Sequence, residues 1–227
     1  MREIVLDTET TGFEPETGDR IVEIGAVELF NHMPTGKTFH EYINPQRSMP
    51  QGAFEIHGLG DNFLRDKPLF AAVGRKFVDF VGDAKMVIHN AAFDMKFLNA
   101  ELGWMGLPAL PITQAIDTLA IARKKFPGSP SSLDALCRRF GIDNSSRTLH
   151  GALLDSEILA EVYLELIGGR QPDLVLATTR AKGSSGDATW RPYPRPRALP
   201  SRLSDAEAAA HNAFVQAMGD GAIWNKA

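Results

Sequence analysis

The spacing of apolar and polar residues predicts a group of strands at the start of the chain. Apolar side chains dominate or alternate with polar ones in short runs bounded by turn-forming residues, at 3–8, 21–30, 37–44 and 85–89. The first three runs are joined by short links, residues 31–36 being the second link, and such links favour antiparallel neighbours. The stretch 45–68 is rich in turn residues, which predicts a loop.

Helical spacing takes over in the later part of the chain. Apolar residues recur every three to four positions in segments 70–81, 92–102, 116–126, 131–140 and 152–167. Ser131 and Asp134 suit a capping pair for the fourth of these helices. Strands first, and then strands alternating with helices, predict an α/β domain built on a mixed sheet.

The composition changes after Gly168. Residues 168–200 contain five prolines and few core-forming side chains, so we expect a flexible linker there. Ser204 and Glu207 then form the pattern of a capping box, and Gly219 is a natural helix end. The expected organisation is a catalytic domain at 1–167, a linker at 168–200 and a short helical tail at 201–227.

Charge is distributed unevenly along the chain. The net charge is −4 overall, but residues 1–167 hold 16 basic and 23 acidic side chains and so carry −7. Duplex DNA is gripped mainly by lysine and arginine, which displace counterions from the phosphates. An acidic domain is therefore expected to meet nucleic acid at a short local site, helped by metal ions.

The sequence predicts a cytoplasmic protein that does not enter a membrane. No run approaches the roughly 18–20 consecutive apolar residues that cross a bilayer. The start of the chain has an acid within its first apolar segment, unlike a signal peptide. Cys137, the single cysteine, has no partner for an internal disulfide and is expected to be a packed thiol.

The first strand ends in a pair of acids. Asp7 and Glu9 project from the same face because side chains alternate along a strand. Two such carboxylates repel each other unless a cation lies between them, and their hard oxygens suit Mg²⁺ or Mn²⁺. By themselves, the acids could equally be solvated at an exposed strand end.

Two later segments add acids near helix starts. Asn90 and Asp94 follow the fourth strand, at the expected N-cap and first turn of the next helix, whereas His89 is expected to bond locally. His150 and Asp155 begin the last helix of the domain, and a histidine can accept a proton from a metal-bound water at neutral pH. Helix capping explains either segment alone. Together the four carboxylates could hold two divalent cations, the arrangement used in phosphodiester cleavage.

The three segments in this order resemble the exonuclease motifs of the DEDD superfamily in its histidine subtype, DEDDh. The strings DTETTGF, HNAAFD and LHGALLDSEILAEVY look like those of the epsilon proofreading subunits of bacterial DNA polymerase III. The resemblance covers about residues 1–167. It implies a ribonuclease H-like fold with a mixed five-stranded sheet flanked by helices, and 3′–5′ exonuclease activity that removes mispaired 3′-terminal nucleotides.

The resemblance also implies roles for individual residues. Asp7, Glu9, Asp94 and Asp155 would bind two Mg²⁺ or Mn²⁺ ions, and His150 would be the general base. Thr8 and Thr10 would lie beside the terminal nucleotide, and His57 would approach it from the segment 53–58. The full set expected to touch substrate is Asp7, Thr8, Glu9, Thr10, His57, Asn90, His150 and Asp155.

The end of the chain carries two expectations about partners. Gln171, Leu174 and Leu176 resemble the short peptides with which bacterial replication proteins dock into the sliding clamp. The tail after residue 200 has too few apolar residues for its own core, so it is expected to meet a partner groove, which by resemblance belongs to the polymerase alpha subunit. Two other functions stay open from the sequence: an RNA-trimming DEDDh exonuclease and a non-catalytic polymerase-binding scaffold.

Overall fold

The computed structural model describes residues 1–145, 147, 149–169, 203–219 and 223. Contacts divide the chain into two compact units, Met1–Val175 and Leu176–Ala227, each considered by itself. The first unit contains one five-stranded sheet in the order β3-β2-β1-β4-β5. Its strands are β1 (Arg2–Thr10), β2 (Ile21–Phe30), β3 (Met33–Tyr42), β4 (Lys85–Ile88) and β5 (Ala115–Asp117). The sheet is mixed, because β1 pairs antiparallel with β2 and parallel with β4, which confirms the expected fold class.

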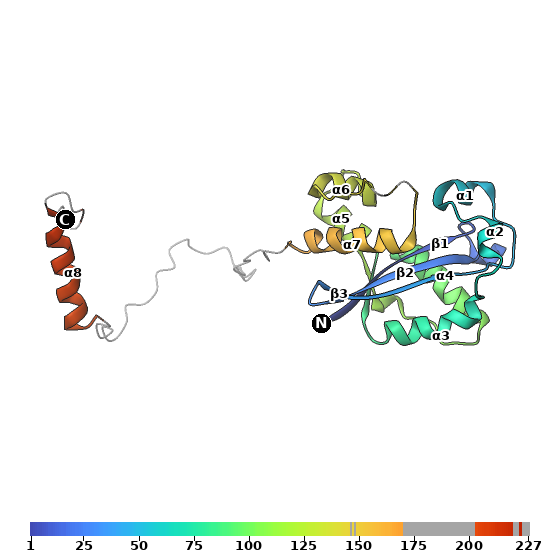
Figure 1. Ribbon diagram of the computed structural model, residues 1–227, viewed down its shortest axis with the longest axis horizontal. Coiled ribbons are helices and arrows are strands. Elements are labelled where there is room, and N and C mark those ends of the chain that lie inside the picture. Colours follow the sequence, from blue (N-terminus) through green and yellow to red (C-terminus); the bar gives the residue numbers. More distant parts are fainter. Residues whose placement is uncertain (146, 148, 170–202, 220–222, 224–227) are drawn as a thin grey trace, which may run out of the picture. The chain divides into compact units, whose positions relative to one another are not determined.

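Helices cover both faces of this sheet (Figure 1). They are α1 (Gln51–His57), α2 (Asp61–Leu64), α3 (Phe70–Val81), α4 (Ala91–Trp104), α5 (Thr118–Lys125), α6 (Leu133–Phe140) and α7 (Ala152–Leu166). Two short 3₁₀ helices, Pro15–Thr17 and Ile112–Gln114, complete the unit. Each face has its own apolar core, in which β1 contributes Ile4 and Leu6 to the side of α3 and α4 and Val5 to the side of α6 and α7.

Three predictions about strands and turns were wrong in their limits. The turn between β2 and β3 is only two residues long, because Asn31 and His32 adopt φ angles of 50° and 65°, as a tight hairpin requires. Strand β3 therefore starts at Met33 rather than at residue 37. Residues 115–117 form β5, so the predicted helix 116–126 begins at Thr118 instead, with Asp117 as its cap. Three residues are too few to show a strand period.

Two further corrections concern helices. The predicted loop 45–68 contains the short helices α1 and α2, whose glycine- and proline-rich surroundings hid them. The start of α6 is capped by Ser132, which accepts a hydrogen bond from the Ala135 amide, and not by the predicted pair Ser131 and Asp134. Cys137 is buried in the core, as expected.

The second unit contains one described helix, α8 (Asp205–Ala217). Ser204 and Glu207 form the predicted capping box at its start. Several apolar side chains in this part of the chain are exposed, namely Leu203, Phe214, Met218 and Ile223. In the described part of the chain, no helix is long and apolar enough to cross a membrane.

Candidate active site

The predicted acids meet at the edge of the sheet where β1 and β4 end. These strands are parallel neighbours, so their carboxyl ends lie together. In parallel sheets this edge is where ligands bind. Asp7 and Glu9 belong to the end of β1, while Asp94 lies in the first turn of α4, directly after β4. Asp155 comes from the first turn of α7, which packs against β1 and β2.

Gly25 allows the start of α7 to come this close. It pairs with Asp7 in the β1–β2 ladder, and a Cβ atom at this position would lie 2.1 Å from the Leu153 backbone nitrogen. Ser156 fixes the same contact, because its buried hydroxyl donates to the Gly25 carbonyl at 2.9 Å. The helix therefore places Asp155 over the end of β1 only because position 25 has no side chain.

Thr8 holds Asp94. Its backbone amide and its hydroxyl donate to the same carboxylate oxygen of Asp94, at 3.1 and 2.7 Å. Thr8 is 5% exposed and Asp94 is 3% exposed, so these bonds lie away from solvent. One threonine thus links the end of β1 to the first turn of α4.

The acids strongly affect one another. Burial raises the pKa of Asp7 well above its ordinary value, and the charges of Asp94, Glu9 and Asp155 raise it further. Burial, with the charges of Asp155, Glu23 and Asp94, raises the pKa of Glu9 to about 8. Burial raises the pKa of Asp94 to about 7, although the bonds from Thr8 oppose this. The four predicted carboxylates therefore share one electrostatic environment.

Arg147 is a member of this site that the sequence analysis missed. Its Nε and Nη2 atoms donate to the two oxygens of Asp155 at 2.5 and 2.7 Å, and its Nη1 atom donates to Asp134 at 2.8 Å. The Arg147 side chain is only 8% exposed. Burial raises the pKa of Asp155, but bonds from His150 and Arg147 outweigh this and leave that pKa below its ordinary value. A basic residue eight positions before an acid is not a recognisable sequence motif. The pair of Arg147 and Asp155 is therefore evident only in the folded protein.

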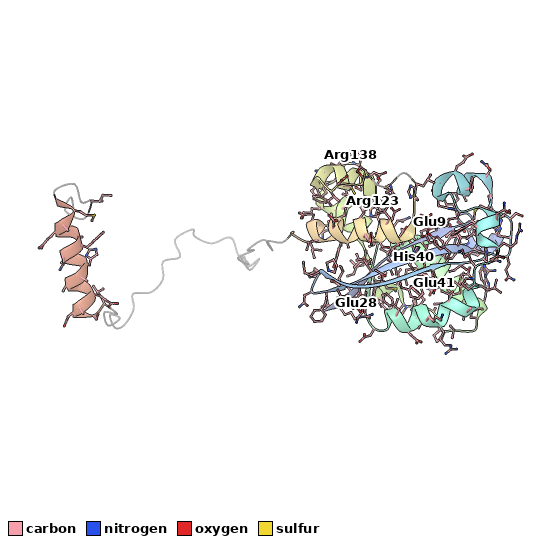
Figure 2. The ribbon with its side chains drawn as sticks, viewed as in Figure 1. Glu9, Glu28, His40, Glu41, Arg123 and Arg138 are labelled. Carbon is pink, nitrogen blue, oxygen red and sulfur yellow. The ribbon has the colours of Figure 1, made fainter. Side chains whose placement is uncertain are left out.

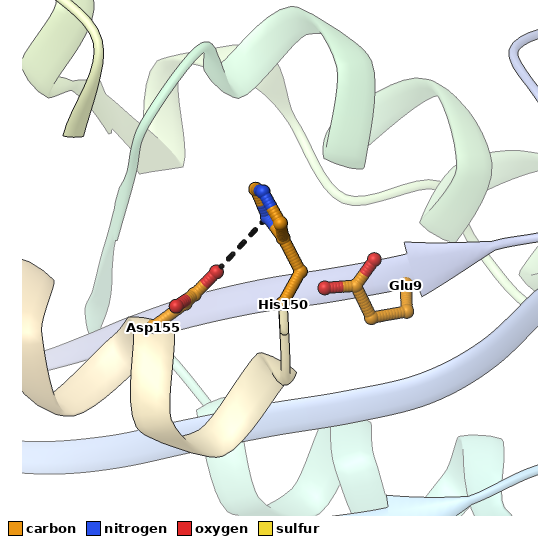
Figure 3. A group of neighbouring side chains, drawn as sticks. All are labelled: Glu9, His150 and Asp155. Atoms are coloured by element: carbon orange, nitrogen blue, oxygen red, sulfur yellow. Dashed lines mark ion pairs between the residues drawn. The ribbon is translucent and has the colours of Figure 1, made fainter. Parts of the chain in front are cut away.

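His150 lies next to Asp155 and Glu9 (Figure 3). Its Nδ1 atom is 3.4 Å from Asp155 Oδ2 and 2.8 Å from Arg147 Nη2, and its side chain is 47% exposed. The backbone amide of His150 donates to the Ile56 carbonyl at 3.1 Å, which ties it to α1. Glu9, His150 and Asp155 each offer a ligand atom within 4.8 Å of the others.

This donor set fits divalent cations. Mg²⁺ and Mn²⁺ prefer carboxylate oxygens, and Asp7, Glu9, Asp94 and Asp155 supply them from rigid strand and helix ends. Carboxylates whose pKa values are raised by burial and by one another's charge are stabilised in their ionised form when a cation enters. Buried acids would otherwise cost folding free energy, so their concentration here favours a metal site over solvated acids or helix caps.

Two cavities adjoin the cluster on either side of His150. We call the first the nucleoside cavity, because it is lined by Thr8, Thr10 and His57, which the family resemblance places beside the terminal nucleotide. It has a volume of about 900 Å³ and is also lined by Glu9 and by residues of α1, α4 and the segment after β1. We call the second the strand cavity, where the word strand refers to nucleic acid and not to a β-strand. It has a volume of about 670 Å³ and is lined by Asp7, Asp155, Arg147 and several residues between 119 and 134. Of the described residues that line these cavities, His150 alone is common to both.

Most residues predicted to touch substrate line the nucleoside cavity, whereas Asp7 and Asp155 line the strand cavity. His57 is 5% exposed, and its Nδ1 atom accepts a hydrogen bond from the Leu59 amide, which leaves the proton on Nε2. The Nε2 atom has no partner of good geometry among the described residues, although the Thr10 backbone lies close enough to offset part of the lowering of the His57 pKa by burial. Thr10 itself donates to the Gly12 carbonyl at 2.6 Å.

Asn90 lines the same cavity but does not cap α4 in the predicted way. It occupies the N-cap position with a left-handed backbone, φ 70°, and its side chain accepts no capping bond. The backbone amide of Asn90 donates to Asp117 Oδ1 at 3.2 Å. The Asn90 side chain is exposed. As expected, His89 bonds locally, 3.0 Å from the Thr118 hydroxyl. The predicted clamp-binding residues Gln171, Leu174 and Leu176 lie outside the described residues.

Comparison with known proteins places the chain in a family. Residues 4–163 match the RNase_T model, described as an exonuclease. The DNA polymerase III subunit epsilon of Escherichia coli strain K12 is 46% identical over 237 residues, which cover 98% of this chain and 97% of that protein. The subunit of the same name from Rickettsia felis is 57% identical over 174 residues, covering 75% of this chain and 76% of that protein.

Solved structures agree on the fold. Exonuclease X in complex with 5′-overhanging duplex DNA is 26% identical, with a TM-score of 0.56, and the match covers 72% of this chain and 90% of that one. The nuclease domain of 3′hExo, a DEDDh family member bound to rAMP, is 21% identical, with a TM-score of 0.63 and coverage of 73% and 91%. The second likeness bears on the fold alone, and it agrees with the mixed sheet described above.

Proposed function

We propose the function of this chain from the premise that it belongs to the family of DNA polymerase III epsilon subunits and carries their exonuclease domain. It is a 3′–5′ exonuclease that proofreads newly made DNA by removing mispaired 3′-terminal nucleotides as nucleoside 5′-monophosphates. The observation that carries the proposal is the convergence of four carboxylates and His150 at one sheet edge. A polymerase-binding scaffold without activity would need none of these buried acids.

Asp7, Glu9, Asp94 and Asp155 would hold the divalent cations, which are Mg²⁺ or Mn²⁺ in this proposal. When bound, such cations lower the pKa of water and neutralise the charge that develops on the attacking and leaving oxygens. The protein supplies the geometry. Thr8 fixes Asp94, and Arg147 fixes Asp155, so both carboxylates are oriented before substrate arrives.

His150 accepts the proton of the attacking water. Its imidazole is half exposed at the border of the two cavities, where a water and a phosphodiester can both reach it. The backbone bond to Ile56 and the contact with Asp155 limit its movement. A neutral imidazole at this position can accept a proton from water as a general base.

The nucleoside cavity takes the 3′-terminal nucleotide. Phe13 and Phe93 form an edge-to-face pair at its wall, with ring centroids 6.4 Å apart, and Phe13 is 73% exposed. An exposed aromatic ring offers a stacking surface for any base. His57 lines the same cavity, and its buried Nε2–H group would serve as a donor for the sugar or phosphate.

Purified variants test the active-site proposal. Asp7→Ala should fold normally yet lose exonuclease activity on a single-stranded DNA 3′ end, while His150→Ala should lose most activity and still bind Mn²⁺. Circular dichroism and calorimetric Mn²⁺ titration provide the folding and binding controls. Activity of Asp7→Ala equal to that of the parent protein would end the metal proposal, and an unchanged rate in His150→Ala would assign the base elsewhere.

The nature of the nucleic acid is the second point to test. The RNA-trimming alternative predicts faster hydrolysis of single-stranded RNA than of DNA with the same sequence. The family favours DNA, because the relatives named above are subunits of a DNA polymerase. Parallel measurements of kcat/KM on matched DNA and RNA oligonucleotides decide between the two, and a preference for RNA would overturn the proofreading assignment.

We further propose that the C-terminal tail binds the polymerase alpha subunit. Helix α8 begins with a capping box, and Phe214 within it and Met218 at its C-cap are exposed apolar side chains. Such a helix can dock its apolar residues into a partner groove. Gln171, Leu174 and Leu176 are proposed to contact the sliding clamp on the strength of their sequence pattern alone. Reconstitution with the polymerase and clamp, scoring removal of a terminal mismatch, tests the assembled function.

A further inference from the structure

We propose that the strand cavity binds the nucleotide immediately 5′ of the scissile bond, and that Arg123 contacts the 5′-phosphate of that nucleotide. The inference rests on the proposed exonuclease function, and it extends the substrate site beyond the terminal nucleotide. Of the residues that the sequence predicted to touch substrate, only Asp7, His150 and Asp155 of the reaction centre line this cavity.

The position of the reaction centre gives the substrate a direction. Asp7 and Asp155 line the strand cavity, Glu9 and Thr8 line the nucleoside cavity, and His150 lines both. The scissile phosphate must therefore lie at the border between the two spaces. If the terminal nucleoside occupies one, the leaving 3′ oxygen and the nucleotide attached to it must extend toward the other.

The chemistry of the two walls supports this direction. The nucleoside cavity has an aromatic wall and a buried histidine donor, which suit a base and its sugar. The strand cavity is lined by Arg123 and by the serines at 129, 131 and 132. A guanidinium and hydroxyl groups are typical contacts of a sugar–phosphate backbone. A volume of about 670 Å³ also lies within the range of small-molecule sites.

Arg123 is available for a ligand, whereas Arg147 in the same cavity is not. The Arg147 guanidinium is committed to Asp155 and Asp134 and is almost completely buried. Arg123, in the last turn of α5, is exposed, and it has no hydrogen bond or ion pair within the described part of the chain. The Arg123 guanidinium therefore offers a phosphate a partner near carboxylates that would otherwise repel it.

Minimal substrates isolate this contact. The dinucleotides TpT and pTpT have the same scissile bond and differ only by the 5′-phosphate that Arg123 is proposed to bind. In the parent protein, pTpT should have a higher kcat/KM than TpT. A charge-assisted hydrogen bond of ordinary strength gives a factor of about ten. The p-nitrophenyl ester of thymidine 5′-monophosphate, which lacks the preceding nucleotide, measures catalysis at the reaction centre separately.

The variant Arg123→Gln should lower the ratio of kcat/KM for pTpT to that for TpT toward one. Arg138→Gln is the matched control, because Arg138 is exposed on α6, outside both cavities (Figure 2). Arg123→Lys should keep part of the ratio, since it keeps the charge without the planar fork. Thermal melting of all three variants monitors folding.

The outcomes separate the two proposals. In one outcome, the protein hydrolyses the nitrophenyl ester and TpT, but the ratio of kcat/KM for pTpT to that for TpT is the same in Arg123→Gln as in Arg138→Gln. This result would overturn the strand-cavity site and leave the exonuclease proposal intact. No metal-dependent hydrolysis of any substrate by the parent protein would overturn the exonuclease proposal, and the subsite with it. A selective fall in the ratio for Arg123→Gln would establish the site.

Discussion

Arg147 places a fixed positive charge inside a group of acids. Its bidentate pair with Asp155 and its bond to Asp134 satisfy most of its donors while it is nearly excluded from solvent. Carboxylates that bind metals are commonly oriented by a second hydrogen-bonding partner. On the proposed function, Arg147 would be a positioning residue that acts on metal binding through Asp155.

We expect Arg147→Gln to lower Mn²⁺ affinity and exonuclease kcat by about 10- to 100-fold, since Asp155 would lose its orienting partner. The metal-free variant should also be less stable, by about 3–5 kcal/mol, because a buried carboxylate loses its counterion. Calorimetric titration and urea unfolding measure the two effects. Arg147→Lys retains the positive charge but not the two parallel donors, so its Mn²⁺ affinity should lie between those of the parent protein and Arg147→Gln. If Arg147→Gln bound Mn²⁺ as tightly as the parent protein, a positioning role would be refuted.

The acids also predict an unusual dependence of stability on pH. Burial raises the pKa of Glu9 to about 8 and that of Asp94 to about 7, from ordinary values of 4.5 and 3.8. Between the ordinary and the raised values the folded protein binds more protons than the unfolded chain, so its free energy of unfolding falls as pH rises. In EDTA, the Tm should be higher at pH 5 than at pH 8.

Saturating Mn²⁺ should raise the Tm more at pH 8 than at pH 5, because the metal replaces protons that the acids hold at low pH. Glu9→Gln removes one of the titrating groups and should flatten the pH dependence in EDTA. A Tm in EDTA that rises steadily from pH 5 to pH 8 and does not respond to Glu9→Gln would contradict the assignment of raised pKa values to this cluster.

At the scale of elements, the approach of α7 to β2 decides whether the site exists. The backbone of the first turn of α7 packs directly against Gly25, and the buried hydroxyl of Ser156 donates a hydrogen bond to the Gly25 carbonyl. The same contact sets the position of Asp155 relative to Asp7, the residue paired with Gly25. Packing of α7 on β2 therefore also brings Asp155 to the other carboxylates.

Gly25→Ala should destabilise the fold by about 1–3 kcal/mol and reduce activity more than stability alone explains, because an added Cβ pushes α7 and Asp155 away from β1. Gly103→Ala is the matched control: Gly103 lies inside α4 with no atom near its missing Cβ, so alanine should be neutral or slightly stabilising. Urea unfolding and kcat under conditions where both variants are folded give the comparison. Full activity in folded Gly25→Ala would show that the close approach is not needed.

At the scale of the whole molecule, the site and the proposed partner helix belong to different compact units. The acids, His150 and both cavities lie within Met1–Val175, and α8 lies within Leu176–Ala227. The family model also ends at residue 163, before the second unit begins. Catalysis and polymerase binding are therefore expected to be separable.

A protein truncated after Gly168 should keep its exonuclease activity on single-stranded DNA and lose co-purification with the polymerase alpha subunit. The physical reason is that the site takes its groups from the first unit, while the exposed apolar residues of α8 are removed. Size-exclusion chromatography of the mixed proteins and an exonuclease assay measure the two properties. Polymerase binding retained by the truncated protein would place the interface elsewhere.

The sequence by itself determined the elements that recur with a clear period and the chemistry of the three motifs. It predicted β2 with its correct limits, the helix 70–81, and a helix that starts at Ala152, because their apolar residues repeat over many positions. It also singled out Asp7, Glu9, Asp94 and Asp155, because burying an acid within an apolar run costs folding free energy unless the acid is paired or binds a cation. Elements that span little more than one period, such as β5 with three residues and α2 with four, left no such signal.

Only the tertiary structure decided how these residues meet. The bond from Thr8 to Asp94, the ion pair of Arg147 and the fit of α7 over Gly25 join positions from different elements. Contacts of this kind depend on distances in space between segments whose sequence separation carries no period. The two cavities beside His150 have the same origin, because a cavity is formed by the packing of several elements and is encoded in none of them alone.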